Sequence, residues 1–181
     1  MPDSARNAHT LLLTGVPGVG KTTIIRAVAA ALGGRPLVGF YTEEMREHGE
    51  RKGFRLIGFG SEQGVIAHSD FPHTHRVGKY GVDVATIDRL AAATLRPDDP
   101  QAVYLVDEIG KMECLSVRFV EAMRLVLDTG RPVVATIARK GGGFIAEVKA
   151  RPDVLSWEIG YANRDSMPAR VVAWLSALVS P

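Results

Sequence analysis

A glycine-rich octet between an apolar run and a helical pattern constrains this chain more than any other feature. The apolar run 10–14 precedes the octet, and apolar side chains recur at spacings of three and four residues through 21–32. These patterns predict a strand followed by an amphipathic helix. A glycine loop in that setting wraps closely and points its backbone N–H groups at phosphate oxygens. The octet fits the pattern G-x-x-x-x-G-K-(S/T) and reads Gly15-Val16-Pro17-Gly18-Val19-Gly20-Lys21-Thr22.

The octet also predicts which side chains contact phosphate and metal. Lys21 is expected to reach the β- and γ-phosphates of a nucleotide, and the Thr22 hydroxyl to ligate Mg²⁺. Thr23 belongs to the same predicted nucleotide site. The alternative is a glycine-rich turn with an ordinary surface lysine, but the flanking strand and helix favour the phosphate loop.

A second apolar run ends in two acidic residues, which suits a ligand site at the carboxyl end of a parallel strand. Asp107 is expected to hold Mg²⁺, directly or through water, and Glu108 to orient or deprotonate an attacking water. The alternative is that these acids merely cap a turn, and this alternative is stronger for Glu108 than for Asp107. The predicted nucleotide-site residues of this segment are Val103, Tyr104, Leu105, Val106, Asp107, Glu108, Ile109 and Gly110.

Strand and helix patterns alternate along the rest of the chain. Further strands are expected at 37–42, 132–137 and 155–159, and a hairpin at 54–59 and 65–68. Helices are expected at 82–95, after a cap at Ser116, and at 168–179. The segment 43–52 is expected to be charged and exposed, and 69–81 to be a loop. The alternation predicts an α/β three-layer sandwich with a mostly parallel sheet, formed by one domain spanning 1–181.

Composition narrows the class of protein. The chain has 181 residues, of which 46% are hydrophobic and 23% charged, so it has enough apolar surface to form a core. A net charge of +2 weighs against nucleic acid as the main partner. No apolar run is long enough to span a membrane, and the polar start and the single Cys114 favour a cytoplasmic location. The oligomeric state has no sequence signal.

Several strings together resemble one family, the THEP1-type nucleoside-triphosphatases. The strings are GVPGVGKTT (15–23), GFYTEEMRE (39–47), RVGKYGVDV (76–84), VDEIGKMEC (106–114), ATI (135–137) and NRD (163–165). The resemblance implies Mg²⁺-dependent hydrolysis of ATP, GTP, CTP, UTP and related nucleotides, at a site formed by 15–22 and 103–110. Two departures are Cys114, where the family often has a bulky apolar residue, and the loop 138–143, which lacks an expected proline.

The resemblance also implies a P-loop NTPase fold related to RecA-like proteins. In the branch that pairs a metal aspartate with a catalytic glutamate, an additional strand lies between the two motif strands. Residues 133–137 would form that strand, which would place Thr136 near the γ-phosphate.

Basic and amide side chains outside the two motifs are further candidates. Arg76 and Lys79, and less strongly Arg46, are expected to neutralise charge on the γ-phosphate. The alternative is a solvated charged loop. Asn163 and Arg164 follow the last predicted strand and are candidates for contacts to the base, against the alternative of a turn that opens the last helix.

Three functions are compatible with these observations. The first is an NTP hydrolase, in which positioning and electrostatics supply the catalysis. The second is an ATP-using kinase of a nucleotide or small metabolite, with 43–52 and 69–81 binding the acceptor. The third is a nucleic-acid-associated ATPase, which the balanced charge disfavours.

Overall fold

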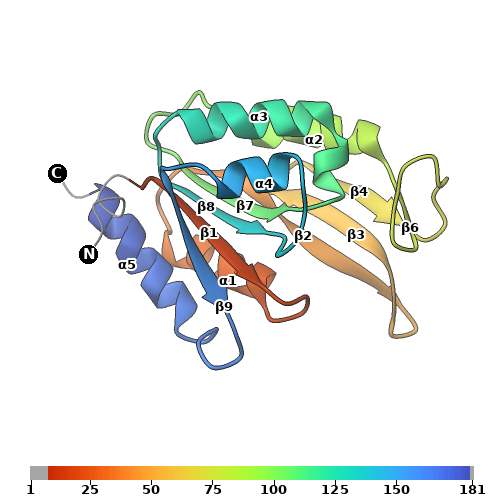
Figure 1. The fold of residues 1–181 in the computed structure, drawn as a ribbon, viewed down its shortest axis with the longest axis horizontal. Coiled ribbons are helices and arrows are strands. Elements are labelled where there is room, and N and C mark those ends of the chain that lie inside the picture. The colour runs from red at the N-terminus through yellow and green to blue at the C-terminus, as the bar shows by residue number, and fades with distance from the viewer. Residues whose placement is uncertain (1–7, 180–181) are drawn as a thin grey trace.

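The computed structural model describes residues 8–179, whose strands join into one mixed sheet with helices on both faces (Figure 1). The strands are β1 (Thr10–Gly15), β2 (Leu37–Glu47), β3 (Glu50–Gly58), β4 (Gln63–His68), β5 (Arg76–Val77), β6 (Tyr80–Val82), β7 (Val103–Ile109), β8 (Val133–Ile137) and β9 (Val154–Ile159). The helices are α1 (Lys21–Ala31), α2 (Val84–Thr94), α3 (Val117–Asp128), α4 (Phe144–Lys149) and α5 (Met167–Val179), with a short 3-10 helix, η2 (Glu113–Leu115).

The strands lie in the order β5-β6-β4-β3-β2-β7-β8-β1-β9. From β2 to β9 neighbouring strands are parallel, whereas β3 to β6 extend the sheet with antiparallel hairpins. Strand β8 lies between β1 and β7, which is the place that the sequence predicted for it. The carboxyl ends of β1 and β7 therefore meet at one edge of the sheet, on either side of β8.

Both faces of the parallel strands are covered. Consecutive leucines of β1 are fully buried: Leu12 belongs to the core under α2, α3 and α4, while Leu11 and Leu13 belong to the core under α1 and α5. Side chains alternate between the faces of a strand, so an uninterrupted apolar run fits a sheet buried on both sides. Figure 1 shows these three layers, with α2 and α3 above the sheet and α1 and α5 below it.

Side-chain caps begin two helices that the sequence predicted. Asp83 accepts a hydrogen bond from the Thr86 N–H (2.9 Å) at the start of α2. Ser116 accepts from the Phe119 N–H (2.9 Å) at the start of α3, which confirms the cap expected there.

The charged segment 43–52 is largely exposed, as expected, and it also continues the sheet. Strand β2 runs to Glu47 and β3 begins at Glu50, with the two antiparallel strands joined at His48-Gly49. Both turn residues have positive φ (49° and 82°), as a tight hairpin turn requires. Because nearly all residues of this segment are polar, its sequence lacks the alternation of apolar and polar side chains from which a strand is predicted. The expected loop 69–81 likewise contains β5 and the start of β6.

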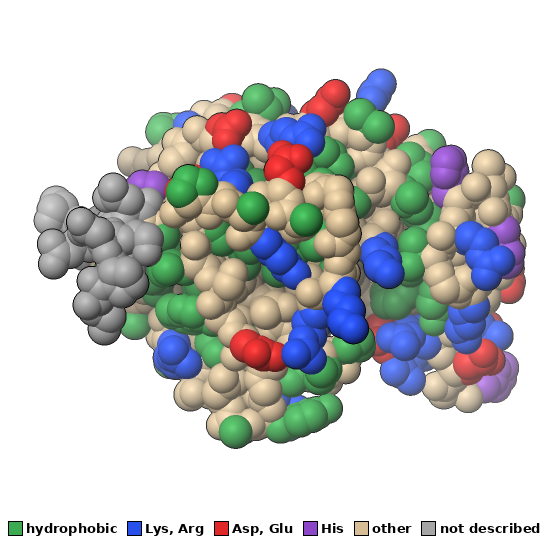
Figure 2. Space-filling model, in the orientation of Figure 1, with side chains coloured by type: hydrophobic (Ala, Val, Ile, Leu, Met, Phe, Trp, Pro, Cys, Tyr) green, Lys and Arg blue, Asp and Glu red, His purple; other side chains and the backbone are tan. Residues whose placement is uncertain are grey.

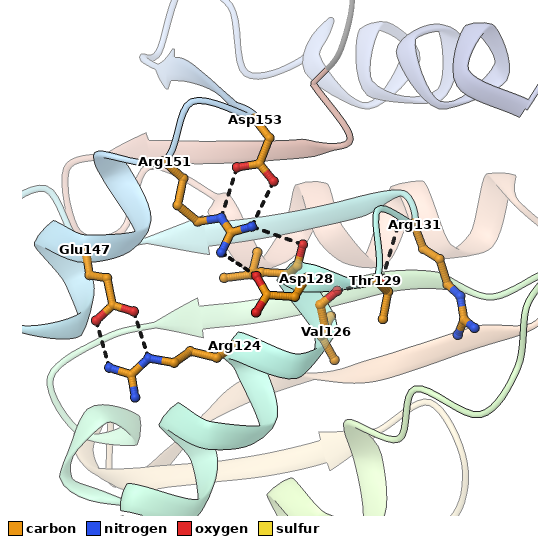
Figure 3. Close-up of polar contacts among 9 residues, drawn as sticks. Arg124, Val126, Asp128, Thr129, Arg131, Glu147, Arg151 and Asp153 are labelled. Carbon is orange, nitrogen blue, oxygen red and sulfur yellow. Dashed lines mark hydrogen bonds and ion pairs between the residues drawn. The ribbon is translucent and has the colours of Figure 1, made fainter.

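Two arginine side chains form ion pairs that connect α3 with α4 and with the segment that follows α4 (Figure 3). Arg151 donates to both oxygens of Asp153 (3.0 and 2.9 Å) and to Asp128 (2.7 Å). Arg124 donates to both oxygens of Glu147 (2.7 Å each). The Arg124–Glu147 pair is about half exposed and therefore contributes little to stability, whereas the Arg151 and Asp153 side chains are 25% and 30% exposed.

Gly39→Ala is expected to destabilise the fold strongly. Gly39 has φ +115°, and a Cβ there would overlap the Leu105 carbonyl oxygen of β7. Backbone strain and displacement of β7 together should lower the free energy of unfolding by about 3 kcal/mol or more. Gly34→Ala is the matched control, because φ is also positive (+88°) but its Cβ would meet no atom within 4 Å. Equal losses in urea unfolding would contradict this account.

Candidate active site

The glycine-rich octet forms the loop between β1 and α1. Gly18 and Gly20 adopt φ values of +78° and +108°, which side chains with a Cβ rarely adopt, and α1 begins directly after Gly20. The first N–H groups of a helix have no partner within it, so this end of α1 presents donors to the loop. Lys21 bends back over the loop, and its Nζ donates to the Gly15 carbonyl (3.3 Å).

Asp107 is held by three threonine hydroxyls at the carboxyl edge of the sheet. Its side chain accepts from Thr22 (2.6 Å) and Thr42 (3.1 Å) at Oδ2 and from Thr136 (2.6 Å) at Oδ1. The residue is buried, with 1% of its surface exposed. Within residues 8–179, no lysine or arginine forms an ion pair with it. A buried carboxylate that neighbours several hydroxyl oxygens and forms no ion pair with a basic side chain is suited to bind a hard metal ion.

Glu108 and Glu113 bring two further carboxyl groups to the same edge. A Cβ added to Gly110 would lie 3.0 Å from Glu108 Oε1 and 2.8 Å from Glu113 Oε2, so both side chains converge on this glycine. Lys21 Nζ lies 3.8 Å from Glu108 Oε2. Burial raises the pKa of Glu108, Lys21 opposes the rise and Asp107 adds to it. The charge of Glu108 is thus balanced by one lysine.

Burial raises the pKa of Glu113 to about 8, and the negative charges of Glu108 and Asp107 add to the rise. Hydrogen bonds from the backbone of Glu113 and Gly110 to the Glu113 carboxyl group oppose it. Sequence reasoning missed Glu113; its only signal was a second acid shortly after Glu108, within a string quoted for family resemblance. Cys114, next to it, packs against the core, as predicted, and burial raises the pKa of its thiol to about 12.

The raised pKa of Glu113 predicts how stability depends on pH in the metal-free, nucleotide-free protein. The folded state keeps the Glu113 proton up to about pH 8, whereas the unfolded chain loses it near 4.5. The free energy of unfolding should therefore fall as pH rises through this window. The side chain introduced by Glu113→Gln does not titrate, so the variant should not show this loss. As pH rises from 4.5 to about 8, its free energy of unfolding should increase relative to that of wild type by roughly 3–5 kcal/mol. Denaturant unfolding with chelator present tests this, and parallel pH profiles would contradict it.

The motif residues line a cavity of about 1380 Å³. Figure 2 shows Lys and Arg side chains gathered around a hollow between the body of the molecule and the part formed by the antiparallel hairpins. Small-ligand pockets commonly measure about 300–1,000 Å³, so this cavity has room for a nucleotide and more. Predicted residues in its wall are Gly15, Val16, Pro17, Gly18, Gly20, Lys21, Thr22, Thr23, Arg46, Asp107, Glu108 and Gly110. Wall residues that sequence reasoning did not single out include Arg26, Thr42, Arg51, Phe54 and Glu113.

Other predicted residues support the site from the core. Val19, Ile109 and the strand residues 103–106 are buried in the core and do not line the cavity, although they were predicted to belong to the nucleotide site. Thr136, predicted to sense the γ-phosphate, is fully buried and donates to Asp107.

Four further predicted side chains, which do not belong to the core, also lie outside the cavity wall. Arg76 donates to the Gly78 carbonyl (2.9 Å), and Lys79 donates to Glu50 (2.9 Å), both on the exposed surface of the hairpins. The Asn163 side chain accepts from the Gly160 N–H (2.9 Å) and donates to the Glu158 carbonyl (3.0 Å), so it organises the turn after β9. The Arg164 guanidinium lies over the Tyr161 ring, 5.3 Å from its centre.

Comparison with known proteins places the chain in a class of enzymes. A family model described as NTPase matches residues 10–172. Nucleoside-triphosphatase THEP1 of Thermotoga sp. (strain RQ2) is 40% identical, over 91% of this chain and 94% of the relative. The cancer-related nucleoside-triphosphatase of Homo sapiens is 35% identical, over 91% and 95%. The crystal structure of THEP1 from the hyperthermophile Aquifex aeolicus superposes with a TM-score of 0.83 at 33% identity, over 92% of this chain and 98% of that one.

The chain belongs to this NTPase family, which includes nucleoside-triphosphatase THEP1. It is a hydrolase of nucleoside triphosphates, as the resemblance predicted. Within residues 8–179, no helix is both long and apolar enough to cross a membrane.

Proposed function

We propose that the chain hydrolyses nucleoside triphosphates of any common base, with Mg²⁺, in the cavity above the glycine loop. The observation that carries this proposal is the buried Asp107 carboxylate, bonded to the Thr22 hydroxyl at the start of α1 (2.6 Å). It joins the glycine loop to the acid pair of β7 in one site. We further propose that residues 1–181 act as one domain in the cytoplasm.

Thr22 and Asp107 fit a magnesium ion. Mg²⁺ prefers oxygen ligands and commonly binds through one or two protein side chains together with phosphates and water. The hydroxyl and carboxylate oxygens of these residues lie side by side beneath the loop. Bound there, Mg²⁺ would neutralise negative charge on the β- and γ-phosphates.

The remaining residues have roles that follow from their positions. Backbone N–H groups of the glycine loop and of the first turn of α1 bind the phosphates, and Lys21 moves from the Gly15 carbonyl to the β- and γ-phosphate oxygens. Glu108, with its raised pKa and its place beside Lys21, orients a water and accepts its proton as the oxygen attacks the γ-phosphorus in line. An additional strand, β8, and a glutamate after Asp107 support assignment to the RecA-like branch of P-loop folds.

Arg76, Lys79, Asn163 and Arg164 remain predictions in this proposal. The first two would reach the γ-phosphate only if the β5–β6 hairpin moved toward the glycine loop, since their side chains now bond within the hairpins. The last two would reach the base from the turn after β9.

Phosphate release tests the proposal. Purified protein is incubated with ATP, GTP, CTP or UTP, with Mg²⁺ or with chelator. We expect release from all four nucleotides with Mg²⁺ and none with chelator. Release from only one nucleotide would contradict broad base choice, and metal-independent release would contradict the Mg²⁺ site.

A phosphotransferase is the second candidate, because the cavity exceeds the volume of a typical ligand site and is partly walled by charged hairpin residues. The second candidate predicts that a phosphate acceptor raises ATP turnover and becomes phosphorylated. Incubation of the protein with labelled ATP and a metabolite extract distinguishes the two: a new labelled product favours the kinase, and inorganic phosphate alone favours the hydrolase.

A further inference from the structure

One face of the β2–β3 hairpin forms a wall of the cavity. Thr42, Glu44 and Arg46 alternate along β2 and so share a face of the strand. Thr42 donates to Asp107, which directs this face toward the glycine loop, and Glu44, Arg46 and Arg51 all line the cavity. The hairpin therefore places charged side chains in the wall of the same cavity that the glycine loop lines.

Glu44 holds two arginines of this wall. It accepts from Arg46 Nη2 and from Arg51 Nη1, at 2.6 Å each. Burial raises the pKa of Glu44, but its hydrogen bonds and charge interactions with Arg46 and Arg51 outweigh burial and lower it below its ordinary value. Glu44 is therefore ionised at neutral pH and fixes both guanidinium groups.

The two arginines differ in how many of their donors are satisfied. Arg46 donates from Nε (3.1 Å) and Nη2 to Glu44, and from Nη1 (3.1 Å) to the Gly49 carbonyl. Arg51 donates from Nη1 to Glu44, but its Nε is buried and has no hydrogen-bond partner within residues 8–179. The Arg51 guanidinium also lies over the Phe54 ring, 5.5 Å from its centre. A buried donor without an acceptor is unfavourable. The Arg51 side chain as a whole is 42% exposed and lines the cavity, so an anion there can accept from its guanidinium group.

We propose that Arg51, oriented by Glu44, forms an anion subsite on the hairpin wall that takes the γ-phosphoryl group of the bound nucleotide. Lys21 meets this group from the glycine loop, and Arg51 meets it from the β2–β3 hairpin, which lines the same cavity. A guanidinium fork matches two phosphate oxygens and stabilises the charge that develops during transfer. The inference rests on the proposed function, because it assumes that the glycine loop places the γ-phosphate in this cavity.

Arg51→Ala and Arg51→Lys test the subsite in the full chain. With Mg²⁺ and ATP, we expect kcat to fall about 10²–10³-fold in Arg51→Ala. Affinity for ADP should stay within about threefold of wild type, because ADP has no γ-phosphate, whereas affinity for a non-hydrolysable ATP analogue should fall about tenfold or more. Added guanidinium ion should restore part of the activity of Arg51→Ala. Arg51→Lys keeps the charge and most of the side chain but lacks the fork, so it should also lose activity.

Lys52→Ala is the matched control. Lys52 follows Arg51 on β3, pairs with Glu50 (3.2 Å) and lies outside the cavity wall, so its loss removes one positive charge from the same hairpin without touching the subsite. If wild type hydrolyses ATP and Arg51→Ala keeps its kcat, or if Lys52→Ala loses as much as Arg51→Ala, the subsite is wrong while the proposed function stands. If wild type itself releases no phosphate, the proposed function fails first.

Discussion

Lys21→Ala is expected to lower kcat/KM for every nucleoside triphosphate by about 10²–10³-fold or more. Within residues 8–179, the Lys21 ammonium donates one hydrogen bond, to the Gly15 carbonyl, and lies 3.8 Å from Glu108 Oε2. It is thus free to move to the phosphates when a nucleotide enters. Its loss removes a positive charge from the γ-phosphate and also raises the pKa of Glu108 further, because Lys21 is the charge that lowers that pKa. Steady-state phosphate release with Mg²⁺ measures the effect.

Lys52→Ala is again the control, since it removes a lysine of equal charge outside the cavity wall. Wild-type kinetics in Lys52→Ala with a large loss in Lys21→Ala would locate the reaction at the glycine loop. Full activity in Lys21→Ala would place it elsewhere.

Glu108→Gln is expected to lower kcat by about 10²–10⁴-fold while nucleotide affinity stays close to that of wild type. The amide keeps the shape of the side chain but accepts no proton from water. Since the pKa of Glu108 is raised, the activity of wild type should also decline toward low pH at a higher pH than an ordinary glutamate would cause. Calorimetric titration with ADP, together with kcat across the pH range, separates binding from chemistry.

Glu121→Gln serves as the matched control for this variant, because Glu121 is exposed on α3 and lies outside the cavity wall. If Glu108→Gln turns over normally, another group activates the water, and Glu113, whose side chain converges with that of Glu108 on Gly110, is the next candidate. Comparable losses in Glu108→Gln and Glu121→Gln would point to a general effect of charge.

Local patterns predicted most of the fold. The glycine loop, α1 and the buried run ending in Asp107 each depend on residues that are close in sequence, so periodicity and spacing were sufficient to place them. The three-layer arrangement followed from the alternation of strands and helices, and β8 lies where the acid pair indicated.

Features that depend on contacts between distant segments were missed. The segment 43–52 has the composition of a solvated loop, and its strands become evident only when Glu44 on β2 pairs with Arg51 on β3. Thr42 was marked only by its place at the end of a predicted strand and within a string that resembles the family, yet it contacts Asp107. Arg76 and Lys79 were candidates and Arg51 was not, because the sequence does not reveal which basic side chains face the cavity.

A single-turnover experiment tests the central claim most directly, because it reports the chemical step without product release. Enzyme in excess is mixed with γ-labelled ATP, with Mg²⁺ or with chelator, using wild type and Glu108→Gln. The account predicts that wild type with Mg²⁺ converts bound ATP to labelled inorganic phosphate, whereas wild type with chelator, and Glu108→Gln, leave the ATP intact. Phosphate formation at the wild-type rate in Glu108→Gln, or in the presence of chelator, would contradict it.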